Sequence, residues 1–216
     1  MKRFVLATRN TDKVSEIQKI MNLNISLVGI GSFPEAEDVI EDGQTLHENA
    51  LKKALAAFTV TGLPSIADDT GLEVDALNGQ PGVWSSRFAG EQATYADNNR
   101  KLLRMLQDVP EQKRTARFRC VTCLADGNHI HYEEGISEGI ITLELRGKSG
   151  FGYDPLFFVP ELNKTFAELS LQEKNACSHR GKAFRAMAAY MQKRYGLERR
   201  NKRQESRNKN QEKDDR

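Results

Sequence analysis

Residues 65–77 read SIADDTGLEVDAL, and two adjacent aspartates, Asp68 and Asp69, follow its short apolar run. Adjacent carboxylates repel one another, and each is costly to remove from water unless something compensates. The run PSIAD therefore predicts a buried strand that ends at a turn, and GLEVDAL predicts a second strand just after that turn. A turn cap, a basic partner or a metal ion would each offset the cost of the aspartates.

Strands and helices alternate on the N-terminal side of this stretch. KRFVLAT predicts a strand, DKVSEIQKIMN has the apolar spacing of a helix, and NISLVGIGSF predicts another strand. Thr45 and Glu48 match the capping box T-x-x-E, so a helix is expected from there to about Thr61. Such alternation is typical of an α/β protein.

Antiparallel structure is expected on the C-terminal side. The loop NGQPGVWSSRFAG precedes a helix predicted over residues 95–107, and two long strand-like runs flank residues 126–128 as a hairpin. Ser170 and Glu173 form a second capping-box match, and a last helix is predicted from about Gly181 to Tyr195. Together these elements predict an α/β protein with a mixed sheet, in two lobes with a cleft between them.

The composition of the 216 residues is that of a globular protein, with 38% hydrophobic and 29% charged residues. The net charge of +2 is uneven, because residues 197–216 carry eight Lys/Arg against five Asp/Glu and leave residues 1–196 at −1. We therefore expect one two-lobed domain over 1–196 and a charged tail over 197–216 that is disordered or a frayed extension of the last helix. The near-neutral body does not resemble a nucleic-acid groove, but the basic tail leaves a weak RNA or DNA contact as an alternative.

Neither a targeting segment nor a membrane segment is predicted. The apolar run before Thr8 is only four residues long, shorter than the core of a secretion signal, and no apolar run approaches the length of a membrane span. Three cysteines, an odd number, argue against a disulfide framework. The protein is therefore expected to be cytoplasmic.

Several nucleotide- and metal-binding motifs are incomplete. GKS at 147–149 would need a glycine at position 142 to form a P-loop, and Thr142 stands there. GIGSFP and GFGYDP both carry proline where a dinucleotide fingerprint needs its third glycine. Cys120 and Cys123 form a C-x-x-C, but a strand-like run would send their side chains to opposite faces, which disfavours zinc.

Three groups of residues predict a nucleotide site. The segment 8–13 opens a helix with a lysine, which suits a phosphate; the alternative is a plain cap with a solvent-exposed lysine. Acidic residues at 41, 42, 68 and 69 offer the oxygen ligands that Mg²⁺ prefers, unless the aspartate pair is a simple turn. The stretches SGFGYDPLFF and EKNACSHRGKA combine glycines, aromatic rings and cationic donors that suit a base; the alternative is a turn followed by a basic helix start.

Five motifs in register resemble one family. LATRNTDKVSEIQKI, TLHENALKKA, IADDTGLEVDALNGQPGVWSSRFAG, SGFGYDPLFFVP and EKNACSHRGKA cover nearly all of residues 4–190. Through them the sequence resembles the inosine/xanthosine triphosphate pyrophosphatase family, the Ham1-like non-canonical purine nucleotide hydrolases. The resemblance implies a mixed, elongated central sheet with flanking helices, two lobes around an active-site cleft, a homodimer and dependence on Mg²⁺. It also implies hydrolysis of ITP, dITP and XTP to the monophosphate plus pyrophosphate, which keeps these bases out of DNA and RNA.

The resemblance also implies roles for individual residues. Asp69 matches the catalytic and metal-binding position, and Glu41 matches a second metal-binding position. The positions that match substrate contacts are Thr8, Arg9, Asn10, Thr11, Asp12, Lys13, Thr70, Phe151, Gly152, Tyr153, Asp154, Lys174, His179 and Arg180. Arg9 departs from the family, since many members have glycine there, and the family pattern often ends near residue 196.

Base selection is expected to come from hydrogen-bond donors. Inosine and xanthosine carry an oxygen acceptor at C6 where adenosine carries an amine donor, so Lys174, His179 and Arg180 would favour the oxygen. The closest rival activity is a pyrophosphatase that acts on canonical or modified pyrimidine nucleotides. A nucleic-acid-binding module that uses the basic tail, and a zinc or redox protein built on the C-x-x-C, would be rivals of a different functional class.

Overall fold

A mixed sheet of eight strands organises the computed structural model, which describes residues 1–200. The strand order is β2-β1-β3-β5-β6-β7-β8, and β4 pairs with β3 beside this path. The strands are β1 (Lys2–Leu6), β2 (Ile25–Gly29), β3 (Ser65–Val74), β4 (Pro81–Gly82), β5 (Thr115–Asp126), β6 (His129–Ile141), β7 (Phe157–Val159) and β8 (Lys164–Thr165). β1 runs parallel to β2 and β3 and the other pairings are antiparallel, which confirms the predicted mixed sheet.

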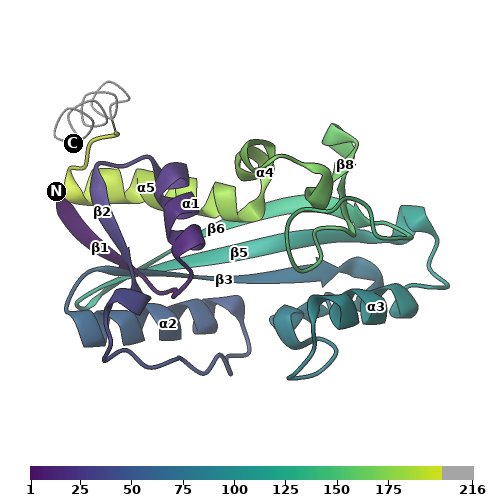
Figure 1. Cartoon of the computed structure of the whole chain (residues 1–216), viewed down its shortest axis with the longest axis horizontal. Coiled ribbons are helices and arrows are strands. Elements are labelled where there is room, and N and C mark those ends of the chain that lie inside the picture. Colours follow the sequence, from purple (N-terminus) through teal and green to yellow (C-terminus); the bar gives the residue numbers. More distant parts are fainter. Residues whose placement is uncertain (201–216) are drawn as a thin grey trace, which may run out of the picture.

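Five α-helices within residues 1–200 cover the two faces of this sheet. They are α1 (Thr11–Met21), α2 (Leu46–Thr61), α3 (Tyr95–Met105), α4 (Leu171–Cys177) and α5 (His179–Tyr195). Figure 1 shows α2 and α3 on one side of the long strands β3, β5 and β6, and α1, α4 and α5 on the other. The fold is elongated along these strands, as predicted (Figure 1). None of the described helices combines the length and apolar character that a membrane span requires.

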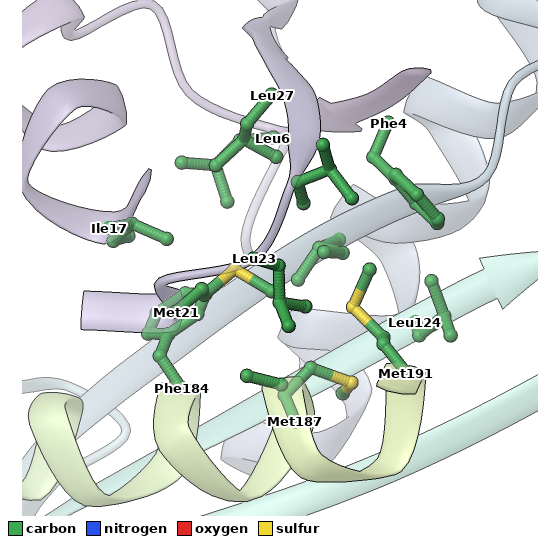
Figure 2. Packing of buried hydrophobic residues seen from close by; sticks show 13 residues of the cluster. Phe4, Leu6, Ile17, Met21, Leu23, Leu27, Leu124, Phe184, Met187 and Met191 are labelled. Atoms are coloured by element: carbon green, nitrogen blue, oxygen red, sulfur yellow. The ribbon is translucent and has the colours of Figure 1, made fainter. Parts of the chain in front are cut away.

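Apolar side chains on both faces of the sheet form the core. Figure 2 shows Phe184, Met187 and Met191 of α5 turned toward Phe4 and its neighbours on the N-terminal strands. On the opposite face, the alanines of α2 pack against β3 and β5. Because alanine is small, α2 lies close to β3, and the polar residues of α2 are brought near the edge of that strand.

The predicted turn at the aspartate pair is wrong, because β3 runs without a break from Ser65 to Val74. Ten successive residue pairs join β3 to β5 in an antiparallel ladder, which satisfies its backbone on that side. Side chains alternate along a strand, so Asp68 and Asp69 point to opposite faces of the sheet. The two carboxylates are thereby separated without a turn.

Local capping signals predict the helix starts well. Thr45 caps α2 by accepting a hydrogen bond from the Glu48 N–H, although the Glu48 side chain accepts from Gln44 rather than from Thr45. Ser170 and Glu173 form the complete capping box of α4. These contacts lie within one helical turn, which is why sequence spacing alone reveals them.

The charged segment predicted to begin at Leu197 is described only as far as Arg200. Leu197 packs against the cluster drawn in Figure 2, and Glu198 accepts a backbone hydrogen bond from Asn24 at 2.8 Å. Residues 201–216 lie outside the described residues, and the prediction of disorder for them stays a prediction.

Candidate active site

The candidate site lies where one edge of β3 is open. β1 pairs with β3 only at Ser65 and Ile66, and β4 pairs with it only at Leu72 and Glu73. Among the described residues no strand pairs with the stretch between them on this side. Side chains from both faces of the sheet therefore reach the same gap, and a cavity of about 260 Å³ opens there.

Most of the residues predicted from the sequence line this one cavity. They are Lys13, Glu41, Asp69, Thr70, Phe151, Gly152, Tyr153, Asp154, Lys174, His179 and Arg180. They come from α1, β3, α4, α5 and two loops, so the fold brings together segments that lie far apart in the chain.

Asp69 lies on the α2 side of the sheet and shares one lysine with Glu41. The Lys53 ammonium lies 2.8 Å from Glu41 Oε2 and 3.2 Å from Asp69 Oδ1, and Asn49 Nδ2 donates to Asp69 Oδ2 at 3.2 Å. Burial raises the pKa of Asp69 to about 6; the Lys53 charge opposes this shift and the Glu41 charge adds to it. Burial would by itself lower the pKa of Lys53, but the surrounding carboxylates outweigh it and keep that pKa raised. One ammonium serves two carboxylates, which leaves this part of the site short of positive charge.

Asp68 lies on the other face and is held by two cations. Lys13 Nζ lies 2.8 Å from Asp68 Oδ1, and Arg180 Nε lies 3.5 Å from Oδ2. Burial opposes ionisation of this carboxyl, but Lys13 and Arg180 outweigh it and hold the pKa of Asp68 well below its usual range. Asp68 is therefore an ionised anchor that ties the start of α1 to the start of α5.

His179 occupies the first position of α5, two residues before the predicted helix start, because the Ser178 hydroxyl caps the helix. Its ring stacks on Phe118 with the ring centroids 4.6 Å apart. Burial, helped by the Arg180 charge, holds the pKa of His179 well below 6.5, so the imidazole is neutral near pH 7. His179 Nδ1 is buried and lacks a hydrogen-bond partner within the described part of the chain. A neutral imidazole thus lines the cavity.

A glycine in β6 lets α5 come this close to the sheet. A Cβ added at Gly135 would lie 2.1 Å from the His179 carbonyl oxygen and 2.5 Å from Ala183 N. A side chain at this position would push the start of α5 off the sheet. Gly135 therefore sets how deeply His179 and Arg180 enter the site.

The loop 150–154 forms another wall of the cavity. Asp154 Oδ2 accepts a hydrogen bond from the Phe151 N–H at 2.8 Å and pairs with the Lys174 ammonium. Lys174 Nζ and the Arg180 guanidinium lie 4.6 and 5.4 Å from the centroid of the Phe151 ring. An aromatic ring with two cations close to it suits a flat ligand rich in acceptors.

The predicted phosphate segment begins α1. The Asn10 side chain caps the helix by accepting a hydrogen bond from the Lys13 N–H at 3.0 Å, and Thr11 and Asp12 follow in the first turn. Of these residues Lys13 alone lines the cavity that holds Asp69.

Thr8 and Arg9 lie beside a neighbouring cavity of about 630 Å³ that shares Glu41 and Lys53 with the first. Arg9 Nε donates to Asp38 Oδ1 at 2.8 Å, so this side chain is tied to the acidic loop after β2. An arginine at this position is therefore held by a local ion pair.

Sequence reasoning missed Lys53 and Asn49, which hold Asp69. Both belong to the motif TLHENALKKA and stand four residues apart, so they share one face of α2. Two polar side chains on a helix face that is otherwise lined by alanine could have indicated that both residues belong to the site. Ser85 and Asn98, which also line the cavity, had no such signal, because only tertiary contacts bring them there.

The donor set fits a hard divalent cation with few protein ligands. Within residues 1–200 no group of three or more His, Cys, Asp or Glu side chains is placed to hold a metal. Glu41 and Asp69 nevertheless converge on one position, where the Lys53 ammonium lies. Mg²⁺ typically takes one or two carboxylates and completes its coordination with water and substrate phosphates. The carboxylate pair and the shortage of positive charge beside it match this coordination preference.

Known proteins match most of this chain. Residues 4–190 match the Ham1 family. A protein from Desulforamulus reducens named dITP/XTP pyrophosphatase is 54% identical over 185 residues, which are 85% of this chain and 92% of that protein. A protein of the same name from Geobacter sulfurreducens is 51% identical over 185 residues, 85% of this chain and 93% of its own. The solved structure of a HAM1 protein from Coxiella burnetii has a TM-score of 0.83 at 43% identity, and the match covers 89% of this chain and 100% of that one. The chain belongs to the Ham1 family.

Proposed function

We propose that this protein is a nucleoside triphosphate pyrophosphatase that hydrolyses ITP, dITP and XTP to the monophosphate and pyrophosphate. The relatives named dITP/XTP pyrophosphatase support the substrate class. The observation that carries the proposal is the meeting of Asp69, Lys53 and Glu41 with a neutral His179 in one cavity. One end of the cavity suits phosphate chemistry, and the other suits a purine ring.

Asp69 accepts the proton in this proposal. A carboxylate with a pKa of about 6 is ionised in most molecules at pH 7 and is basic enough to take a proton from water. The water oxygen forms a bond to the α-phosphorus as the bond from that phosphorus to the bridging oxygen breaks. The bridging oxygen leaves on pyrophosphate, and Lys13 and Lys53 are the nearby cations that stabilise the developing charge.

Glu41 and Asp69 are the residues that would hold Mg²⁺, and a bound Mg²⁺ would supply positive charge to the phosphate oxygens. When Mg²⁺ is not bound, Lys53 holds the two carboxylates together. Dependence on Mg²⁺ is therefore part of the proposal.

Purine selection is assigned to the loop 150–154 and the start of α5. Phe151 offers an aromatic surface, and Lys174 and Arg180, which lie over its ring at 4.6 and 5.4 Å from the centroid, are the donors. A 6-oxo purine places an acceptor against these cations, whereas the 6-amino group of adenine places a donor there. Because a site built around hydrogen bonds penalises such a mismatch strongly, ATP is expected to be a poor substrate.

Pyrophosphate release tests this proposal. ITP, XTP, ATP, GTP and a pyrimidine triphosphate would each be supplied with and without Mg²⁺, and the pyrophosphate would be measured enzymatically. Metal-dependent release confined largely to ITP and XTP is the expected result. Equal release from all five would contradict the base selection, and preferential release from the pyrimidine nucleotide would favour the rival activity.

Two further properties implied by the family resemblance belong to the proposal. We expect the protein to form a homodimer, which light scattering coupled to gel filtration would measure. We also expect it to act in the cytoplasm, where nucleoside triphosphates are made and consumed.

A further inference from the structure

Two adjacent asparagines on α3, Asn98 and Asn99, are almost completely buried, with 2% and 6% of their surface exposed. A buried amide is costly unless it is hydrogen-bonded, so two in succession on one helix need a reason. Successive residues on a helix point in directions about 100° apart, so the two side chains reach different neighbours.

Asn98 holds the loop that follows β4 with both ends of its amide. Asn98 Oδ1 accepts a hydrogen bond from the Ala89 N–H at 2.7 Å, and Nδ2 donates to the Ser86 carbonyl at 2.9 Å. Ser86 lines the cavity, and the neighbouring Ser85 accepts a hydrogen bond from the Tyr153 hydroxyl at its carbonyl. Asn98 thus fixes one wall of the cavity.

Asn99 holds the opposite loop by a single bond. Its Nδ2 donates to the Gly152 carbonyl at 2.9 Å, while its Oδ1 is buried without a hydrogen-bond partner among residues 1–200. An unpaired buried acceptor destabilises a fold, and an apolar side chain here would avoid that cost. The hydrogen bond to the Gly152 carbonyl is therefore the reason that we infer for an asparagine at this position.

The Gly152 carbonyl lies in the middle of the loop 150–154. Gly152 has a φ of +61°, in the left-handed region that favours glycine. Phe151 on one side presents the ring that faces the cavity, and Asp154 on the other pairs with Lys174. A rotation of this peptide would therefore move both the stacking surface and the cation beside it.

We propose that Asn99 is a positioning residue for the base, which orients the loop 150–154 through the Gly152 carbonyl, while Asn98 holds the facing loop at a fixed distance. α3 thereby sets the width of the base pocket, and base selectivity depends on a helix that supplies none of the reacting groups. This inference rests on the proposed function, because it assigns Asn99 to the recognition of the same substrate.

The test compares Asn99→Asp and Asn99→Ala with wild type and with Arg100→Ala. Asn99→Asp keeps the shape of the side chain and removes its donor. Arg100 stands next to it on the exposed face of α3 and, among residues 1–200, forms an ion pair only with Asp97, so its loss is a matched control. KM and kcat for ITP and for ATP would be measured for each protein, together with the Tm.

We expect both Asn99 variants to raise KM for ITP about 10- to 100-fold with kcat changed by less than about 3-fold, because a small displacement of a substrate-positioning group costs up to about 10²-fold. The ratio of kcat/KM for ITP over ATP should fall by a similar factor, and Arg100→Ala should match wild type. Wild-type KM and selectivity in folded Asn99 variants would overturn the inference, and so would a loss of kcat alone.

A failure of the proposed function is seen in the wild type, which would then release no pyrophosphate from ITP, and the inference would be refuted as well. A failure of the inference alone is seen only in the variants. If neither Asn99 variant folds, Asn98→Asp provides the second test. It keeps the acceptor for Ala89 and loses the donor to Ser86. It should raise KM with little effect on kcat, and an unchanged KM would overturn the inference.

Discussion

Removing the Lys53 cation is the sharpest test of the charge arrangement at the site. Lys53→Met keeps the length of the side chain and deletes the ammonium that lies between Glu41 and Asp69. The Lys53 and Asp69 side chains are 14% and 12% exposed, and Glu41 is 39% exposed. Loss of one partner from a buried pair costs about 3–5 kcal/mol, whereas an exposed pair is worth about 1 kcal/mol or less.

The partly buried triad lies between these limits, so we expect Lys53→Met to lower the free energy of unfolding by about 2–4 kcal/mol. For a protein of this size that corresponds to a fall in Tm of about 4–16 °C. Added Mg²⁺ should raise the Tm of the variant more than that of wild type, because the two carboxylates then lack their own cation.

Thermal unfolding with and without Mg²⁺ measures both effects. Lys52→Met is the matched control: Lys52 is the preceding residue of α2, it is 46% exposed, and it pairs with the exposed Asp42. Its Tm should stay within about 2 °C of wild type, since surface pairs contribute little. Equal losses of Tm in the two variants, or equal stabilisation by Mg²⁺ in Lys53→Met and wild type, would refute the reasoning.

Three further changes test other parts of the site. Asp69→Asn should lower kcat for pyrophosphate release by about 10³-fold because it removes the proton acceptor, and circular dichroism should show an intact fold; near-normal turnover would remove Asp69 from the chemistry. Gly135→Ala should lower the unfolding free energy measured in urea by about 1–3 kcal/mol or more, because its Cβ would lie 2.1 Å from the His179 carbonyl oxygen; an unchanged urea midpoint would contradict this packing. Burial lowers the pKa of His179 in the folded state, so the unfolded chain binds more protons below pH 6.5 and stability falls as the pH drops. His179→Asn should therefore lose less stability than wild type between pH 7 and about 5. If the urea midpoints of the two proteins fell by the same amount across that range, the result would argue against a buried neutral ring.

Contacts within a few residues were readable from the sequence. The helix cap at Thr45, the capping box at Ser170 and the hairpin around residues 126–128 all appear where the spacing predicts them. Each depends on backbone conformation and hydrogen bonds within about four residues, so no distant partner is needed to form it. The family motifs also predicted half of the residues that line the cavity.

The aspartate pair, in contrast, could not be interpreted from its local sequence. Two carboxylates in succession indicate a strand end only if both lie in the same environment. The ladder to β5 holds Asp68 and Asp69 within one continuous strand, and alternation gives each its own face and its own cations. Since β5 lies more than forty residues downstream, no local signal could reveal the ladder.

The sequence by itself determined the local elements, the order of the motifs and the chemical kinds of group at the site. Only the tertiary structure decided which group faces which. Lys13, expected beside phosphate, lies 2.8 Å from Asp68, and the unpredicted Lys53 joins Glu41 to Asp69. The reason is physical. Strand alternation limits a side chain to one of two faces of the sheet, but the helices that pack on each face determine which charged groups lie near it.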